Sequence, residues 1–329
     1  MTIDRRTLIS AALAAGLSTH ASAQTAPPAK GGALPPGLPQ PAETIDLWPK
    51  GAPGMPKGPL AETVDERSTD PQLNDRAVYG ITRPRMAVFR PDVPNGAAIL
   101  ITPGGGYKWV VVDKEGYELG RWLSARGFTV FVLFYRLPGE GWTAGPDVAL
   151  SDAQRAMRLI RHNARRYGVD PLRVAAMGFS AGGHVCADLV ARFAHATYTG
   201  VDAADTLSPR PFCAAPIYPV VSMSPPNAHA GSRKLLIGDD ARLEAAHSPH
   251  RNIATDSPPC FIVHAEDDDV VPVANSLMLR DALKARNIPV ESHFFANGGH
   301  GFGLRKAVGK PAGLWPDLFI AWARSVALI

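Results

Sequence analysis

The chain has 329 residues, of which 46% are hydrophobic and 19% are charged, and it carries a formal net charge of +4. This composition suits one large α/β domain or two small ones. The net charge is small and the basic residues are spread along the chain, so we expect no nucleic-acid partner.

The first 23 residues predict an export signal that is removed from the mature protein. Arg5 and Arg6 precede an apolar run from Leu8 to Leu17, and Ala21-Ser22-Ala23 has the pattern of a cleavage site. The paired arginines are similar to those of a twin-arginine signal. We therefore expect a mature chain without membrane attachment in the periplasm or outside the cell. Residues 24–44, rich in Pro, Gly and Ala, predict a linker before a catalytic domain at 45–329.

From residue 45 onward, apolar runs typical of buried strands alternate with patterns typical of helices. This alternation predicts a mostly parallel sheet with helices on both faces. Between Ala77 and Arg90 the pattern predicts a hairpin or two edge strands. The polar segment Ser224–Pro259 predicts at most a small cap, helical at Ala241–Ala246. The predicted strands are Ala97–Ile101, Phe128–Tyr135, Val174–Met177, Cys213–Tyr218, Cys260–His264 and Val290–Phe295, and the predicted helices are Glu115–Arg126, Asp147–Tyr167, Val185–Phe193, Val273–Arg286 and Pro316–Val326.

The turn Gly178-Phe179-Ser180-Ala181-Gly182 lies between a predicted strand and a predicted helix. A Gly-x-Ser-x-Gly turn in this context is typical of a nucleophile elbow, which lifts the serine hydroxyl above the sheet. The amide of Ala181 then points toward the group that the serine attacks. An ordinary Gly-rich turn has the same pattern, so the assignment of Ser180 as nucleophile depends on partners elsewhere in the chain.

Candidate partners of Ser180 follow the last two predicted strands. The acidic run Glu266–Asp269 comes after one strand, and His300, which lies among glycines, comes after the next. A serine nucleophile needs a base to take its proton and an acid to hold that base. The position of His300 predicts the base, and the acidic run supplies the acid, with Asp267, Asp268 and Asp269 as candidates. A solvated acidic loop or a metal-binding turn is the alternative interpretation of this run.

Glycines also follow the first buried strand, in Pro103-Gly104-Gly105-Gly106-Tyr107. At this place they let backbone amides approach a developing oxyanion and complete the hole that Ala181 begins. A phosphate-binding loop is the competing interpretation. It fails because no Gly-Lys-Ser/Thr follows and the spacing is not Gly-x-Gly-x-x-Gly.

The three cysteines give no disulfide framework because their number is odd and their spacing is wide. We expect Cys186 to be a small buried residue on the helix after the elbow. Cys213 and Cys260 are predicted on neighbouring strands, where a bridge is possible in an oxidising compartment. We expect free thiols at all three positions.

These motifs resemble those of α/β-hydrolase fold serine esterases, in the branch that holds hormone-sensitive-lipase-like, feruloyl and acetylxylan esterases. The resemblance covers the whole chain from about Asp46. It implies that Asp268, in Asp-x-x-Val-Pro, is the acid, and that the amides of Gly105 and Gly106 join Ala181 in the oxyanion hole. Pro103 departs from the family's histidine, as on the carbohydrate-esterase side of the group. The matching segments are Leu47–Gly54, Pro103–Tyr107, Tyr135–Pro138, Gly178–His184, Asp268–Pro272 and Gly299–Gly301.

The resemblance implies a carboxylesterase with the triad Ser180, His300 and Asp268 and with no metal or organic cofactor. Its expected substrates are short acyl esters, chiefly acetyl groups on xylan or a related plant polysaccharide. An exported peptidase or amidase of the same fold is the first alternative, and a non-catalytic binding protein is the second. The aromatic residues near the motifs are expected in the core, with a sugar platform as the alternative; they are Tyr107, Trp109 and Trp142.

Overall fold

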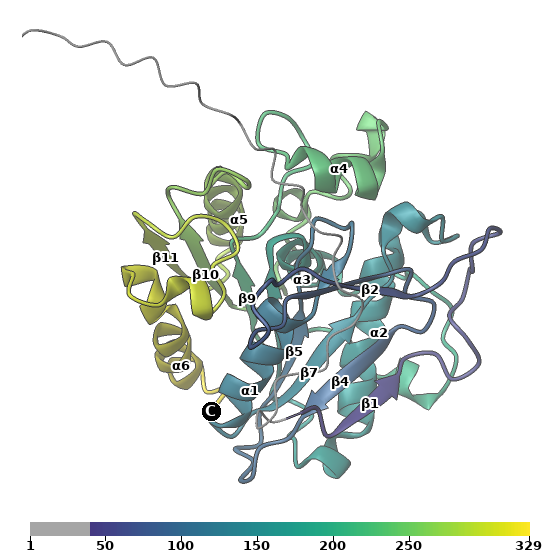
Figure 1. Ribbon diagram of the computed structural model, residues 1–329, viewed down its shortest axis with the longest axis horizontal. Helices are drawn as coiled ribbons and strands as arrows, with labels where there is room; N and C mark the ends of the chain where they lie inside the picture. The colour runs from purple at the N-terminus through teal and green to yellow at the C-terminus, as the bar shows by residue number, and fades with distance from the viewer. Residues whose placement is uncertain (1–39) are drawn as a thin grey trace, which may run out of the picture.

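The structure is a computed structural model that describes residues 40–329 (Figure 1). Its main sheet has eight strands in the order β1-β4-β7-β5-β8-β9-β10-β11. Neighbours from β7 through β11 pair in parallel, whereas β1 and β4 form an antiparallel edge. The strands are β1 Glu43–Asp46, β4 Arg85–Phe89, β5 Ala98–Thr102, β7 Thr129–Phe134, β8 Val174–Phe179, β9 Ala214–Ile217, β10 Cys260–Ala265 and β11 Val290–Phe295.

Helices cover both faces of this sheet, and the central strands are therefore buried along their whole length. Every residue of β7, β8 and β10 is buried, whereas β1 at the edge alternates half-buried and exposed residues. Helices α1 and α6 lie on one face and α2, α3 and α5 on the other (Figure 1). The predicted layered α/β architecture is confirmed. The helices are α1 Glu118–Ser124, α2 Val148–His162, α3 Ser180–Arg192, α4 Ala230–Ile237, α5 Ala274–Ala285 and α6 Trp315–Ser325.

The hairpin or edge pair predicted between Ala77 and Arg90 is wrong. β3 Arg76–Tyr79 joins β2 Thr63–Glu66 and β6 Val110–Val111 in a separate three-stranded sheet, whereas β4 enters the main sheet between β1 and β7. The reason is burial: four of the five residues of β4 are buried, which an edge strand does not allow. The connection between the strands crosses the core through the fully buried Ile81.

Other boundaries also differ from the predictions. β1 begins at Glu43, two residues before the predicted start of the catalytic domain. Helix α3 begins at Ser180 rather than Val185, because the glycine-rich turn itself forms the first helical turn. In the cap the main helix is α4, while the predicted helix at Ala241–Ala246 is only a short 3-10 turn at Ala241–Leu243. The predicted export signal and most of the predicted linker lie outside the described residues.

All three cysteines are free, as predicted, and all three are buried, as predicted for Cys186. Burial raises the pKa of the Cys186 thiol to about 12, so the thiol stays protonated at neutral pH. Within residues 40–329, none of the helices combines the length and apolar character needed to span a bilayer.

Candidate active site

The elbow places Ser180 at the junction of β8 and α3 with a positive φ of 54°. This left-handed conformation is strained for a residue with a side chain, and such strain is common where a nucleophile is held in place. The flanking glycines allow the backbone to pack closely. A Cβ on Gly182 would lie 2.1 Å from the carbonyl oxygen of Thr102, and one on Gly178 would lie 2.3 Å from the carbonyl oxygen of Gly182.

The structure brings together the serine, histidine and aspartate selected from the sequence. Ser180 Oγ lies 2.8 Å from Nε2 of His300, in the loop after β11. His300 Nδ1 lies 2.7 Å from Oδ2 of Asp268, in the loop after β10. An ionised carboxylate only accepts hydrogen bonds, so Nδ1–H donates to Asp268 and Nε2 is left to accept the hydroxyl proton of Ser180.

Donors surround the buried carboxylate of Asp268. The backbone amides of Val270 and Val271 donate to Oδ1 at 3.0 and 2.8 Å. Burial opposes ionisation, but hydrogen bonds from His264 and His300 hold the pKa of Asp268 well below its usual range. Asp268 is therefore a permanent negative charge at the outer nitrogen of His300.

His264 is a second histidine on this carboxylate, and the sequence pattern gave no reason to single it out. Its Nε2 lies 3.1 Å from Asp268 Oδ2 and 3.0 Å from the carbonyl oxygen of Val271. Because both partners accept, Nε2 carries the proton and Nδ1 accepts from the hydroxyl of Ser276 at 2.7 Å. A histidine within an otherwise apolar strand that ends at an acidic run is the only sequence signal for it.

The other two candidate acids have different surroundings. Asp267 Oδ1 accepts hydrogen bonds from the amides of Gly298 and Gly299 at 2.8 and 2.7 Å, which fixes the loop that carries His300. Asp269 is exposed. Of the three aspartates, the structure places Asp268 against His300.

The loop Pro103–Tyr107 lies beside the elbow, and hydrogen bonds to two buried residues hold it in place. Gly104 donates its amide to Oε2 of the buried Glu115 at 3.0 Å, and the hydroxyl of Tyr135 donates to the carbonyl oxygen of Pro103 at 2.7 Å. Within residues 40–329, the amides of Gly105 and Gly106 donate to no protein acceptor. These two amides are therefore available to a ligand.

Glu115 also joins this loop to the histidine loop. Its Oε1 accepts a hydrogen bond from the hydroxyl of Tyr218 at 2.9 Å, and that hydroxyl oxygen accepts one from the amide of Gly303 at 3.1 Å. The Tyr218 ring also packs edge-to-face near His300, with 5.3 Å between centroids. One buried carboxylate thus fixes two of the loops that border Ser180.

The aromatic residues near the motifs divide into two kinds. Tyr107 and Trp142 are buried in the core, as expected, whereas Trp109 is half-buried with Lys108 stacked on its ring. The hydroxyl of Tyr107 donates to Nδ1 of His184 at 2.6 Å, and His184 Nε2 donates to the carbonyl oxygen of His247 at 2.8 Å. Burial lowers the pKa of His184 to about 3, so the ring stays neutral in this chain of contacts.

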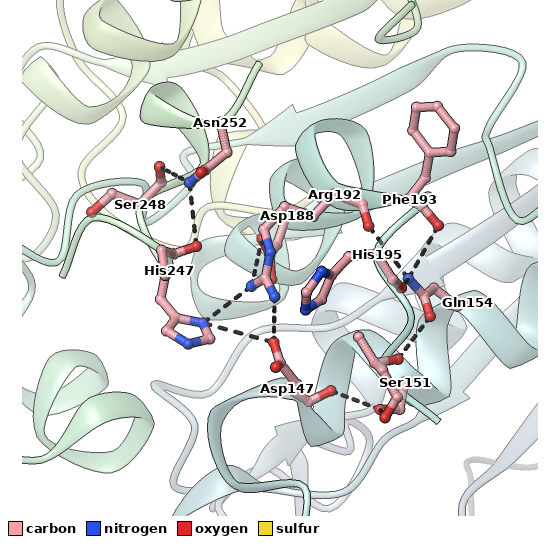
Figure 2. Close-up of polar contacts among 12 residues, drawn as sticks. Asp147, Ser151, Gln154, Asp188, Arg192, Phe193, His195, His247, Ser248 and Asn252 are labelled. Atoms are coloured by element: carbon pink, nitrogen blue, oxygen red, sulfur yellow. Dashed lines mark hydrogen bonds and ion pairs between the residues drawn. The ribbon is translucent and has the colours of Figure 1, made fainter. Parts of the chain in front are cut away.

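Figure 2 shows the ion cluster at which this chain of contacts ends. Arg192 lies 2.6 Å from Asp147, 3.3 Å from Asp188 and 3.2 Å from Nδ1 of His247 (Figure 2). Asp147 precedes α2, Asp188 and Arg192 lie on α3, and His247 belongs to the cap segment. The ligand atoms of Asp147, Asp188 and His247 lie within 4.8 Å of one another, but the guanidinium of Arg192 already contacts all three. We describe these four residues as the Arg192 cluster.

A separate cavity of about 730 Å³ lies away from Ser180. Residues of α1, Arg305 and the start of α6 line it, and burial raises the pKa of Glu118 in its wall to about 7. None of its lining residues belongs to the Ser180–His300–Asp268 group.

Known proteins resemble this chain over most of its described part. The model of the BD-FAE family matches residues 88–283. An acetylxylan esterase of Xylanibacter ruminicola is 31% identical over 67% of this chain and 44% of that protein. Endo-1,4-beta-xylanase B of Butyrivibrio fibrisolvens is 32% identical over 75% of this chain and 39% of that protein. The chain thus spans less than half the length of these two relatives.

Solved structures show the same fold. An acetyl ester-xyloside bifunctional hydrolase from Caldicellulosiruptor lactoaceticus has 32% identity and a TM-score of 0.71, covering 89% of this chain and 98% of that one. The carboxylesterase Cest-2923 from Lactobacillus plantarum, at 23% identity and a TM-score of 0.62, covers 83% of this chain and 99% of that one, and shows the fold alone. The family model matches more than half of the chain, and the relatives agree with it: this protein belongs to the BD-FAE family and has the α/β-hydrolase fold predicted from its motifs.

Proposed function

We propose that this protein is a serine carboxylesterase that removes short acyl groups, chiefly acetyl, from xylan or a related plant polysaccharide. The observation that carries the proposal is the hydrogen-bonded series from Ser180 Oγ through His300 to Asp268. This arrangement activates a hydroxyl for attack on an acyl carbon. The predicted export signal supports a polymeric substrate, because polysaccharides do not enter the cell.

In this mechanism the oxygen of Ser180 attacks the ester carbonyl carbon while Nε2 of His300 takes the hydroxyl proton. Asp268 stabilises the imidazolium that forms and keeps the ring in the correct tautomer. The tetrahedral intermediate then collapses, and His300 delivers its proton to the departing alcohol oxygen. Water, deprotonated by the same nitrogen, attacks the acyl-enzyme, releases the carboxylic acid and restores Ser180.

The negative charge that develops on the carbonyl oxygen needs fixed donors. We assign this role to the amides of Gly105, Gly106 and Ala181. The first two have no protein acceptor within residues 40–329, and the third is one of the unpaired amides in the first turn of α3. Loss of one such donor costs on the order of 10²- to 10³-fold in rate.

The substrate class rests on two relatives. One is an acetylxylan esterase, and a solved relative is an acetyl ester-xyloside bifunctional hydrolase. Ester cleavage is the reaction that the Ser180 site supports. A xyloside-cleaving activity would need a differently arranged pair of carboxylates.

The experiment measures products released from acetylated xylan by the mature protein and by Ser180→Ala. We expect the wild type, and not the variant, to release acetate without producing new reducing ends. Cleavage of 4-nitrophenyl acetate without acetate release from xylan would support the esterase activity but contradict the proposed polysaccharide substrate. Cleavage of peptide or amide substrates alone would support the peptidase alternative, and inactivity on every substrate would support the binding-protein alternative.

A further inference from the structure

His229, at the edge of the active site, does not belong to the family motifs identified above. It is the N-cap of α4 in the cap segment and is half-buried. Apart from atoms of its two chain neighbours, a Cβ built on Gly106 would have the Cε1 atom of His229 at 3.8 Å and no other described atom within 4 Å. The space in front of this oxyanion-hole glycine is therefore open, and the imidazole of His229 borders it.

The contacts of His229 determine which ring nitrogen carries the proton. Nδ1 accepts the backbone amide of Ser232 at 3.2 Å, and the Ser232 hydroxyl lies 2.8 Å from the same nitrogen. A backbone N–H can only donate, so Nδ1 is unprotonated and the neutral ring carries its proton on Nε2. Burial and the nearby His300 lower the pKa of His229, which keeps the ring neutral near pH 7.

The Nε2–H group of His229 has no acceptor among residues 40–329. This nitrogen adjoins Cε1, the atom that borders the space in front of Gly106. His300 contributes to lowering the pKa of His229 after burial, and Asp268 opposes this shift. In ester cleavage the alcohol leaves on the side of the base that protonates it. An ester whose carbonyl oxygen is held by the amide of Gly106 would extend into the open space in front of this glycine, beside the Nε2–H group of His229.

We propose that Nε2–H of His229 donates a hydrogen bond to a hydroxyl or ether oxygen in the alcohol part of the bound ester, and so favours acetyl esters of polyols and sugars. This inference rests on the proposed esterase function. His229 acts as a specificity-determining residue, because it contacts the substrate beyond the reacting atoms. A simple alkyl or aryl ester offers it no acceptor in the alcohol.

The test compares two esters that have the same acyl group and the same three-carbon alcohol skeleton. Glycerol monoacetate carries two hydroxyls on the alcohol, and n-propyl acetate carries none. The variant His229→Asn keeps an acceptor for the Ser232 amide, since Asn is a favourable N-cap, but removes the imidazole. Lys234→Ala, at an exposed position on the same helix, is the control.

We expect His229→Asn to lower the ratio of kcat/KM for glycerol monoacetate over propyl acetate by about tenfold, the usual scale of one lost neutral hydrogen bond. His229→Ala should give the same ratio although it also removes the helix cap, and Lys234→Ala should leave the ratio unchanged. Equal losses on both esters, as expected of an oxyanion donor, or an unchanged ratio would overturn the proposal. The ratio for the two small esters can be measured even if acetylxylan is not a substrate. A negative result with xylan and a negative result for His229 can therefore be told apart.

Discussion

The Ser180–His300–Asp268 group and the Arg192 cluster both pair aspartate with histidine, but the pKa of the aspartate shifts in opposite directions in the two groups. Two backbone amides and two histidines stabilise the negative charge of Asp268, and its pKa lies well below the usual range. Asp188 is buried, and among residues 40–329 it pairs with Arg192, which also pairs with Asp147. Burial therefore raises the pKa of Asp188 to about 7 despite the ion pair.

The histidines differ in the same way. His300 lies in a loop, contacts one carboxylate and has its second nitrogen directed at Ser180. His247 has a cation, Arg192, beside its ring, and burial lowers its pKa to about 4. The Ser180–His300–Asp268 group and the Arg192 cluster contain the same residue types, and they differ in the number and kind of hydrogen-bond donors around the carboxylate.

The largest expected effect is the loss of the nucleophile or base. We expect Ser180→Ala and His300→Ala each to lower kcat on 4-nitrophenyl acetate by about 10⁴- to 10⁶-fold, because both act in one step. Initial-rate assays measure this effect, and unfolding curves of the variants provide the control for folding. If either variant kept a tenth of the wild-type activity, the substituted residue would not have the catalytic role assigned to it.

The next expected effect concerns the acid. Asp268→Asn removes the charge that orients His300, and we expect a loss of about 10⁴-fold in kcat. Asp267→Asn weakens the clamp on Gly298 and Gly299 and should cost far less, and the exposed Asp269→Asn should have no effect. The same rate assay on all three variants tests this order, and equal losses at Asp267 and Asp268 would contradict it.

Breaking the Arg192 cluster should reduce stability rather than chemistry. At pH 8, above the pKa of Asp188, Arg192→Met leaves the buried Asp188 carboxylate without its cation, and we expect a loss of about 3–5 kcal/mol in the free energy of unfolding. Urea unfolding measures it. The matched control is Arg242→Met, which breaks an exposed ion pair with Asp240 and should leave the midpoint unchanged. Similar midpoints for the two variants would refute the buried-pair account.

The smallest expected effect is a pH dependence. The pKa of Asp188 is about 7 in the folded protein and about 3.9 in an unfolded chain, so the folded state binds more protons between these pH values. Stability contributed by this group therefore falls as the pH rises from about 4 to 7. Urea unfolding should show wild-type stability falling relative to Asp188→Asn, by on the order of 3 kcal/mol between pH 4 and 7. A gap that stays constant over this range would argue against a raised pKa.

The pH dependence of Asp268 has the opposite sign. Its folded pKa is lowered, so its contribution to stability is complete above the unfolded value of about 3.9 and is lost as the pH falls further. Asp188 and Asp268 thus affect the free energy of unfolding in different pH ranges, so unfolding curves measured at several pH values distinguish their contributions.

Sequence alone was sufficient for the parts of the fold that depend on local pattern. Strand β11 was predicted at its observed bounds, and Ser180 and His300 were found because each follows a strand end. The strand end alone left three candidate acids, and only the resemblance, through Asp-x-x-Val-Pro, selected Asp268. The sequence did not predict that β3 and β4 belong to different sheets, because the strands that pair with them lie far away in the chain.

Side-chain contacts were the other part that the sequence could not supply. Asp267 accepts hydrogen bonds from Gly298 and Gly299 that exist only once the loops after β10 and β11 are side by side. His264 contacts Asp268 and Ser276 through the fold of the segment that follows β10. The Arg192 cluster joins α3 to a cap residue, His247, that is 55 positions away. No local pattern encodes such pairs, because many buried or exposed positions accept the same residue types.

The most direct test of the central claim is covalent labelling of the nucleophile. The mature protein is treated with a fluorophosphonate, and the modified peptide is located by mass spectrometry in the wild type, Ser180→Ala and His300→Ala. We predict an adduct on Ser180 in the wild type, none in Ser180→Ala and greatly slowed labelling in His300→Ala. An adduct on another residue, or ester cleavage by a protein that is never labelled, would contradict the account.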